Sequence, residues 1–407
     1  MDLFDRMLEE SPVALEEYVT LPEIGGEIKV YEGEFFLKKK AHSFSITGRV
    51  YYSFAEKIRL LFKGVFERFD SGLVVQEVEI IAGEYLLGYA FVQKVSGNII
   101  SGYVNHLETA SFAQCERWRW CYFNGLKFFG ESVRRNRSIS KDRLVFKAGP
   151  YIITIDNKEG YTDQKEKREI SHFCQLMCSD GSYVSKQDAI NEVLLFSRFI
   201  SFVFGCQHAP FFIQGLSNNE VVYEYNAIGL DDSLIGVSSW KPDFKDSDLI
   251  TLWRSFRLKY FESVDQCDIL NTVVHWYLQA NMNKGLLEGA LLLGFTGIEL
   301  LSNVIVGKEL NNEQIIEDLI SRLNLNIGLT PAEIASTRNY LMHYKNERRR
   351  KVYNSMSFEE KYKRMEVELQ ILELAILYWL GYEGHYADRL DHIWQGAGIQ
   401  SVPWCKG

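Results

Sequence analysis

Proline is scarce in this chain, with seven residues among 407, which argues against long disordered linkers. Two of its apolar runs do not suit a membrane span either. The run 193–204 is too short to span a bilayer and contains Arg198, and the run 371–380 contains Glu373. The first ten residues are acidic and lack the basic and apolar segments of a signal peptide. These absences predict a cytoplasmic protein with no membrane partner.

The usual signatures of several enzyme classes are absent too. The sequence has no Gly-rich phosphate loop ending in Gly-Lys-Ser/Thr, no Gly-x-Ser-x-Gly and no His-Glu-x-x-His. Its seven cysteines are odd in number and scattered, which is typical of a reducing compartment. Cys174 and Cys178, with His172 nearby, form one metal-like group, but no second pair follows at zinc-finger spacing. Ordinary reduced cysteines are favoured, and we expect neither a metal nor a cofactor.

Length and composition indicate a soluble protein of more than one domain. A chain of 407 residues exceeds one ordinary hydrophobic core, so two or three domains are expected. Hydrophobic residues make up 46% and charged residues 24%, as in globular proteins. The net charge of −9 disfavours a protein coated in nucleic acid but leaves room for a local basic site.

The first half of the chain predicts a β-rich domain at 1–185. Residues 1–24 are acidic and are expected to form an irregular lead-in. Short apolar or alternating segments then recur between Gly, Asp and Ser, which favours an antiparallel sheet or barrel. The predicted strands are 27–31, 44–52, 59–62, 73–75, 78–81, 89–92, 118–125, 144–146 and 151–155.

Two features of this region have competing interpretations. Its basic cluster is either a solvated loop, which is favoured, or a contact for an anion or nucleic acid. Trp118 and Trp120 alternate on one strand and are expected in the core rather than on a base-stacking surface. The cluster consists of Arg134, Arg135, Arg137, Lys141 and Arg143.

Helical periodicity begins after residue 185. A connector at 186–245 combines one helix with a hairpin whose turn is Asn218-Asn219. Residues 246–407 predict an all-α helical bundle, so the expected fold class is α+β. Its predicted helices are 249–261, 268–281, 286–306, 314–323, one from 331, and 358–380. The apolar helix 286–306 is expected at the centre.

One helix of this domain carries a candidate catalytic pattern. Thr330, Pro331 and Glu333 form a helix start with a capping box. Arg338 and Asn339 follow, and His343 completes the order Arg-Asn-x-x-x-His. Residues 331–365 hold nine Lys/Arg against four Glu, a local reversal of the chain's negative charge. An arginine and a histidine beside basic residues are the parts needed to cleave a phosphodiester.

These residues resemble those of the HEPN family. An apolar helix carrying 295–301 is followed about 40 residues later by Arg338-Asn339-Tyr340-Leu341-Met342-His343. The resemblance covers roughly 245–385, and the β-rich region ahead of it is similar in layout to ApeA-like members. It implies a homodimeric endoribonuclease in bacterial anti-phage defence. It also implies RNA, such as tRNA, as substrate and a phage-derived trigger at the N-terminal domain.

The chemistry suggests a role for each residue of the motif. Histidine titrates near neutral pH, so we assign proton transfer to His343, and phosphate stabilisation to the always-charged Arg338. Asn339 would orient one of them or bind substrate. The expected reaction is metal-independent and leaves a 2′,3′-cyclic phosphate and a 5′-hydroxyl. Further contributions are expected from Lys345, Arg348 and Arg349 to RNA affinity and from Glu299 as a supporting residue.

Alternatives remain open from the sequence. Arg338 could instead form an ion pair with Glu299 while His343 only packs. Residues five apart on a helix are separated by roughly 140°, so Arg338 and His343 do not share one narrow face, which favours completion of the site by a second copy. The domain could also be a non-catalytic module that binds RNA, nucleotide or protein. Finally, the β-rich domain could carry the main function, with the helices as a dimerisation base.

Overall fold

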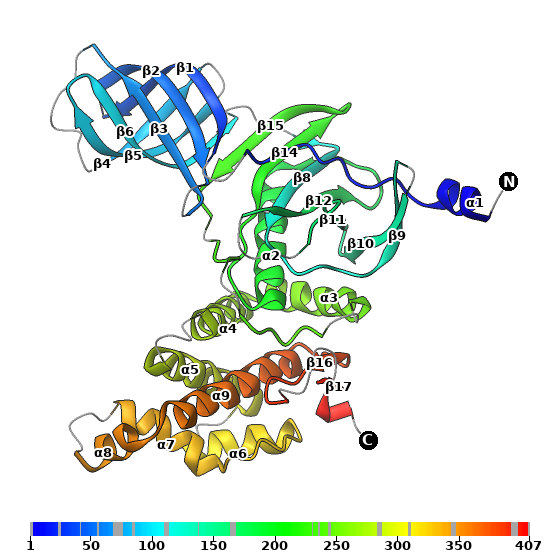
Figure 1. Ribbon diagram of the computed structural model, residues 1–407, viewed down its shortest axis with the longest axis vertical. Coiled ribbons are helices and arrows are strands. Elements are labelled where there is room, and N and C mark those ends of the chain that lie inside the picture. The colour runs from blue at the N-terminus through cyan, green and yellow to red at the C-terminus, as the bar shows by residue number, and fades with distance from the viewer. Residues whose placement is uncertain are drawn as a thin grey trace. The chain divides into compact units, whose positions relative to one another are not determined.

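The chain divides into a unit built mainly of strands and a unit built mainly of helices (Figure 1). Unit 1 contains Met1–Ser197 and His208–Leu234, and unit 2 contains Arg198–Gln207 and Ile235–Gly407. The α+β class, with a β-rich N-terminal region before a mostly helical region, is confirmed. The computed structural model describes residues 3–22, 26–40, 42–54, 57–67, 76–83, 86–109, 114–136, 138–162, 168–229, 231–234, 237–242, 246–282, 287–307, 311–342, 347–391 and 398–405. The predicted strand 73–75 lies outside these residues.

The first part of unit 1 is a closed, antiparallel, six-stranded barrel. Its strands run in the order β3-β2-β1-β4-β5-β6, and β3 pairs with β6 to close it. Closure gives each barrel strand a paired neighbour on both sides, which limits free sheet edges. The strands are β1 (Glu27–Lys39), β2 (His42–Ser53), β3 (Arg59–Val65), β4 (Gln76–Ala82), β5 (Leu86–Ser96) and β6 (Ile99–Thr109).

Alternating side chains fill the barrel interior. Phe35, Phe62 and Ile80 are fully buried, and the rings of Phe35 and Phe62 meet edge to face at 6.0 Å. Space is tight: a Cβ on Gly102 would lie 2.0 Å from the carbonyl oxygen of Phe91. Only glycine therefore fits at that position. The barrel interior is a packed core.

A second group of antiparallel strands follows in the order β15-β14-β8-β12-β11-β10-β9. Trp118 and Trp120 of β8 are fully buried, which confirms their predicted place in the core. On the same face, Phe196 of α2 packs against Trp120. The hairpin turn at Asn218-Asn219, with positive φ at both residues, is also confirmed. The bounds are β7 (Gln114–Cys115), β8 (Arg117–Phe123), β9 (Glu131–Arg135), β10 (Ser138–Ala148), β11 (Tyr151–Asn157), β12 (Ile170–Cys178), β13 (Val184–Ser185), α2 (Lys186–Phe204), β14 (Phe211–Ser217) and β15 (Glu220–Ala227).

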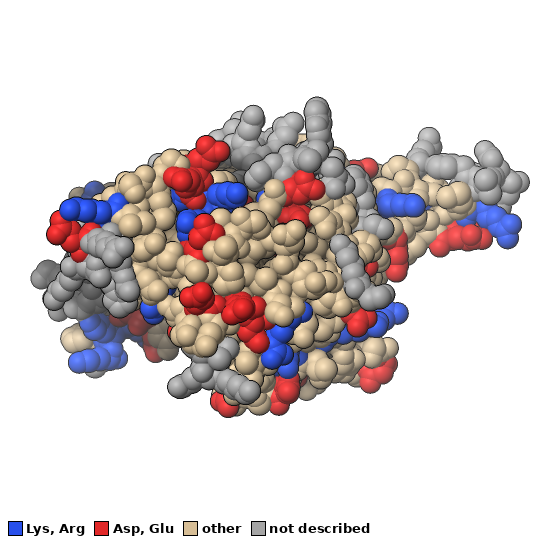
Figure 2. Space-filling view, turned by 90° about the horizontal axis from the view of Figure 1, so that it is seen from below, with Lys and Arg blue, Asp and Glu red and all other residues tan. Residues whose placement is uncertain are grey.

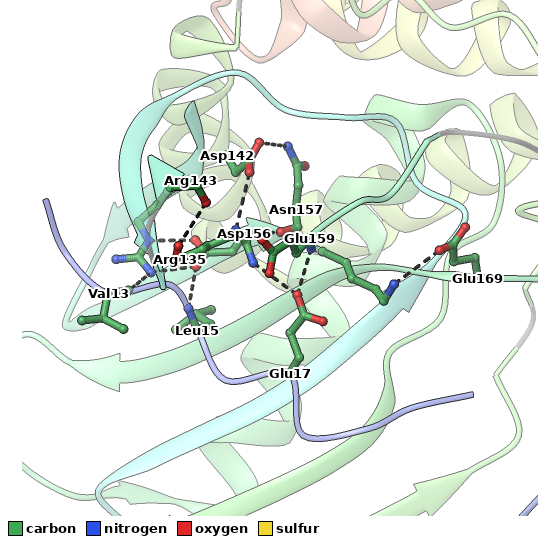
Figure 3. A network of polar contacts seen from close by, with 12 residues as sticks. Val13, Leu15, Glu17, Arg135, Asp142, Arg143, Asp156, Asn157, Glu159 and Glu169 are labelled. Atoms are coloured by element: carbon green, nitrogen blue, oxygen red, sulfur yellow. Dashed lines mark hydrogen bonds and ion pairs between the residues drawn. The ribbon is translucent and has the colours of Figure 1, made fainter. Parts of the chain in front are cut away.

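The N-terminal segment is more ordered than expected. The irregular lead-in predicted for 1–24 is wrong in part, because α1 (Leu3–Glu10) is helical. Residues 12–18 then cross the second group of strands as a strap (Figure 3). The backbone of Ala14 bonds to Arg134 of β9, and the amide of Leu15 donates to Asp156 at 2.7 Å. The strap is therefore held by both backbone and side-chain bonds.

Two arginines of the predicted basic cluster are buried between the strap and the second group of strands. Arg143 is buried and forms two 2.7 Å hydrogen bonds to the carboxylate of Asp156. Arg135 is buried as well, and its guanidinium donates to the backbone oxygen of Asn157 and to Glu17 (Figure 3). For these two residues the solvated-loop interpretation is wrong, because their charges are satisfied within the fold. Arg137 lies outside the described residues.

Unit 2 contains most of the predicted helices within a few residues of their expected ends. The capping box Ser357-x-x-Glu360 at the start of α9 is confirmed. Helix α8 was not predicted. The bounds are α3 (Ser247–Glu262), α4 (Val264–Met282), α5 (Leu287–Val306), α6 (Asn312–Arg322), α7 (Pro331–Met342), α8 (Glu347–Ser355), α9 (Phe358–Trp379), β16 (His385–Ala387), β17 (Ile399–Ser401) and the 3₁₀ helix η2 (Pro403–Cys405).

Helix α5 is the apolar helix expected at the centre of the bundle. It contacts both α4 and α9, and Gly297 faces Leu372 of α9 so closely that a Cβ would lie 2.9 Å from it. By length and composition α5 is also long and apolar enough to cross a membrane, a property that core helices share. Its central packing agrees with the prediction.

A buried charge network ties the C-terminal segment to this bundle. Arg389 is fully enclosed and donates to Glu373 and, at 3.2 Å, to Glu366, both on α9. Tyr277 of α4 donates to Glu373 at 2.7 Å, and the backbone oxygen of Ser238 accepts from Arg389 at 3.3 Å. The neighbouring carboxylates raise the pKa of Arg389 further above its usual range, against the effect of burial. One guanidinium therefore joins three segments distant in sequence.

Replacing Arg389 by methionine is expected to reduce the free energy of unfolding by about 3–5 kcal/mol, because two buried carboxylates would lose the guanidinium that neutralises them. Urea denaturation followed by circular dichroism measures the change. The matched control is Arg322→Met, since the Arg322–Asp318 pair is partly exposed. It should cost less than about 1 kcal/mol. Equal losses for both variants would contradict the account.

Candidate functional site in the helical unit

Helix α7 begins as its sequence predicts. The amide of Glu333 donates to the hydroxyl oxygen of Thr330 at 3.3 Å, and the amide of Thr330 donates to the carboxylate of Glu333 at 2.8 Å. Pro331 takes the first helical position, where a missing N–H costs nothing. These bonds to Thr330 hold the pKa of Glu333 below its usual range. The capping box is confirmed.

Helix α7 contacts the bundle through a narrow face and one arginine. Ile334, Ala335 and Thr337 are its buried residues. Arg364 of α9 donates to the hydroxyl oxygen of Thr337 at 2.9 Å and to the backbone oxygen of Glu333. Arg364 therefore positions α7, a role that its place in the basic stretch 331–365 did not reveal. A signal in the sequence would have been its position directly before the buried part of α9, which begins at Met365.

The two candidate residues that α7 places are half-buried. Arg338 makes no hydrogen bond or ion pair within the described residues, and none joins it to the half-buried Glu299 of α5. The alternative in which Glu299 neutralises Arg338 therefore finds no support in this part of the chain. The side-chain oxygen of Asn339 accepts a hydrogen bond from the side-chain amide of Asn312 at 3.3 Å.

Asn339 also lines an open hollow of about 520 Å³ between α7 and the start of α6. The other lining residues are polar or small, and Arg338 is not among them. The structure thus separates two neighbouring candidates: Asn339 faces this hollow, and Arg338 does not. The lining comprises Asn311, Asn312, Glu313, Ala332, Ala335, Ser336 and Asn339.

The remaining candidates lie outside the described residues in whole or in part. His343 and Lys345 fall between α7 and α8, in the stretch 343–346, which is not described. Arg348 and Arg349 belong to α8 by their backbone, but their side chains are not described. The geometry of the Arg338–His343 pair is therefore still a prediction.

Several basic residues of this region have partners in the same unit. Lys351 pairs with Glu347 at 2.7 Å, with both side chains largely exposed. Lys361 lies 4.3 Å above the ring of Tyr353. Figure 2 views the chain from the end where α6 to α8 lie in Figure 1, and basic and acidic side chains are interspersed there. Among the described side chains, that face carries both signs of charge.

A buried acid lies on α9 one turn beyond Arg364. Glu368 is enclosed, and neither of its carboxyl oxygens has a hydrogen-bond partner in the described part of the chain. Gly294 of α5 approaches it, since a Cβ there would lie 3.7 Å from the Glu368 Oε2 atom. Burial raises the pKa of Glu368 well above its usual range, and the positive charge of Arg364 lowers it by less.

No group of three or more His, Cys, Asp or Glu side chains is placed to hold a metal ion among the residues described in the structure. The seven cysteines form no disulfide, and Cys174 is buried in β12. Burial raises the pKa of the Cys174 thiol well above its usual range, which favours the protonated form over a metal-binding thiolate.

Two stretches of the chain match defined protein domains. Residues 111–230, from β7 to β15, match the YopA central domain. Residues 319–400, which contain α7, α8 and α9, match the YopA C-terminal domain. The chain is therefore similar to YopA proteins in both stretches. The candidate catalytic helix lies in the stretch similar to the YopA C-terminal domain, and the second group of strands lies in the stretch similar to the YopA central domain.

A relative of similar length matches almost the whole chain. The SPbeta prophage-derived uncharacterized protein YopA of Bacillus subtilis (strain 168) is 22% identical over 433 residues, which cover 96% of this chain and 98% of the relative. No solved structure matches the chain. The matches bear the YopA description and give no support to the resemblance to the HEPN family.

Replacing Glu368 by glutamine is expected to remove a pH-dependent loss of stability. The folded state holds the Glu368 proton more tightly than the unfolded state, so stability falls as pH rises above the ordinary carboxyl range of about 4.3. The unfolding free energy of Glu368→Gln relative to wild type should therefore increase between about pH 5 and about pH 8.

Urea denaturation of wild type and variant across this pH range measures the difference. Glu359→Gln, at an exposed position in the first turn of the same helix, is the control and should show a constant difference. A pH-independent difference for Glu368→Gln would show that Glu368 does not gain a proton on folding.

Proposed function

We propose that the helical unit is a metal-independent endoribonuclease that acts in anti-phage defence, in the cytoplasm, as a homodimer. The observation that carries the proposal is Arg338. It lies half-buried on a capped helix, without a neutralising partner among the described residues, five positions before His343. A structural arginine at such a position is usually paired, as Arg364 and Arg389 are in this unit.

The proposed reaction needs few groups. The ribose 2′-hydroxyl loses its proton and its oxygen bonds to phosphorus, while the bond from phosphorus to the 5′-oxygen breaks and that oxygen gains a proton. His343 transfers a proton at one of these oxygens, since imidazole serves as both acid and base near neutral pH. Arg338 stabilises the charge on the phosphate oxygens through its planar guanidinium. The products are a 2′,3′-cyclic phosphate and a 5′-hydroxyl.

Binding the substrate falls to neighbouring residues. Asn339 faces a polar hollow beside α6, which suits contact with a base or ribose. Lys345, Arg348 and Arg349 would contact the RNA backbone, and their contribution would depend on salt rather than on RNA sequence. Transfer RNA is the substrate class that the HEPN resemblance implies.

Two copies complete the proposed site. Regular helical spacing would separate Arg338 and His343 by roughly 140°, so the sequence favours a site that a second copy completes. Helix α7 buries only Ile334, Ala335 and Thr337 against its own bundle, which leaves much of its surface for a partner. The N-terminal β-rich domain would sense a phage-derived trigger. The prophage origin of the Bacillus subtilis relative fits a role in conflict between phage and host.

Purified wild type is expected to cleave RNA in the presence of a chelator, and Arg338→Ala and His343→Ala should each lower the rate by roughly 100-fold or more. Gel analysis of end-labelled RNA, with enzymatic identification of the end groups, measures rate and products. Arg322→Ala, an arginine of α6 outside the motif, is the control and should cleave as wild type does. Equal cleavage by wild type and both motif variants would exclude the site.

The second candidate is a non-catalytic module that binds RNA or nucleotide, favoured by the polar hollow of about 520 Å³ beside Asn339. The same proteins distinguish it. RNA binding that Asn339→Ala weakens, together with no cleavage product from a sample in which the dimer is confirmed by mass, would support this module and refute the nuclease.

A further inference from the structure

A second hollow lies in unit 1, under the N-terminal strap. Its volume is about 380 Å³, within the range of small-molecule sites. One wall is the strap, with Glu16 and Tyr18, and the floor is the second group of strands. Three guanidinium groups line it: Arg117 and Arg119 from β8, and Arg143 from β10.

Strand alternation explains why these arginines share one face. Trp118 and Trp120 point into the core on the α2 side, so Arg117 and Arg119 point to the opposite side. Pairing between strands extends the row, because Arg119 lies opposite Gln175 of β12, and Gln175 lies opposite Thr154 of β11. Both of these polar residues line the hollow.

Arg143 is a fixed part of this floor. Its two hydrogen bonds to Asp156 neutralise it, and its Nη2 atom also donates to the backbone oxygen of Val13 in the strap at 2.9 Å (Figure 3). Asp156 in turn accepts from the amide of Leu15. The pair therefore holds the strap over the hollow. Because Asp156 neutralises Arg143, the pair offers little net charge to a ligand.

Arg117 and Arg119 have no buried carboxylate partner among the described residues, and Arg119 also donates to the side-chain oxygen of Gln214 at 2.9 Å. Arg117 donates to the side chain of Asn219 at 2.6 Å, a neutral partner. Arg119 is mostly enclosed, with 16% of its side chain exposed, and lies 4.0 Å above the ring of Tyr18. Its carboxylate partner is Glu16 at 2.7 Å, whose side chain is 72% exposed.

Glu16 occupies the place that an anion would take. An ion pair with so exposed a partner contributes little to stability, so a ligand with more charge can displace it. A phosphate group offers two negative charges and several acceptor oxygens, and paired guanidinium groups bind it through parallel hydrogen bonds. The lining holds three arginines and one glutamate. Asp156 lies behind Arg143 and offsets one further positive charge, so the site keeps a net positive charge.

We propose that this hollow binds a small phosphate-bearing ligand, with Arg117 and Arg119 holding the phosphate and Glu16 acting as an internal competitor. The inference goes beyond the proposed nuclease and does not depend on it, since the site lies within unit 1. The strap provides a wall of the site, so ligand binding also stabilises the strap.

Isothermal titration calorimetry of the full chain with inorganic pyrophosphate tests the proposal. Wild type is expected to show saturable binding at one site per chain. Arg117→Gln and Arg119→Gln should each weaken binding roughly tenfold or more, because each removes a charged donor. Glu16→Gln should strengthen binding severalfold, a gain that a general loss of structure would not produce.

Arg49→Gln is the matched control, because Arg49 is an exposed arginine of β2 paired with Glu27. The affinity of this variant for pyrophosphate should equal that of wild type.

Titrations with adenosine monophosphate and with inorganic phosphate distinguish an organic phosphate from the free ion. Tighter binding of the nucleotide supports an organic phosphate, and tighter binding of inorganic phosphate supports the free ion. No saturable pyrophosphate binding, affinity unchanged in both Arg variants, or tighter binding of citrate than of pyrophosphate would overturn the proposal.

Discussion

Buried guanidinium groups paired with carboxylates determine how distant segments of this chain meet. In unit 2, Arg389 joins α9, α4 and the segment at Ser238 through one set of hydrogen bonds. In unit 1, the Arg143–Asp156 pair holds the N-terminal strap against β10 and β11. Since an unpaired buried charge is costly, each pair permits only one arrangement of the segments it joins. Both candidate sites lie next to segments placed in this way.

Arg338 differs from these arginines, and the difference carries the functional argument. The guanidinium groups of Arg364 and Arg389 have partners within unit 2, whereas that of Arg338 has none in the described residues. A half-buried, unpaired guanidinium is available to a phosphate. The same contrast appears in unit 1, where Arg143 is neutralised and Arg117 has only a neutral partner. In both units the proposed site contains an arginine whose guanidinium has no carboxylate partner among the described residues.

Local sequence predicted the elements well and their partners poorly. The start of α7 follows from Thr330 and Glu333, which are three residues apart, and the burial of Trp118 follows from alternation along one strand. The partners of Arg135 and Arg143 depend on the register between β9, β10 and β11, which no short stretch specifies. Closure of the barrel between β3 and β6 is likewise a long-range pairing.

The candidate sites show the same division. Arg338 and Asn339 lie on the helix where they were expected, because caps and periodicity are local. The role of Arg364 in holding that helix depends on the packing of α9 against α7, and the hollow under the strap depends on a segment about 100 residues before β8. Sequence alone therefore identified the helix but not what positions it, and it did not find the hollow under the strap.

The central claim is that Arg338 and His343 cleave RNA, and sequencing of RNA 5′-hydroxyl ends from bacteria that express the chain tests it most directly. The account predicts discrete 5′-hydroxyl ends in cells with wild type that are lost with His343→Ala at equal protein level. The same ends at the same abundance in both cultures would contradict it.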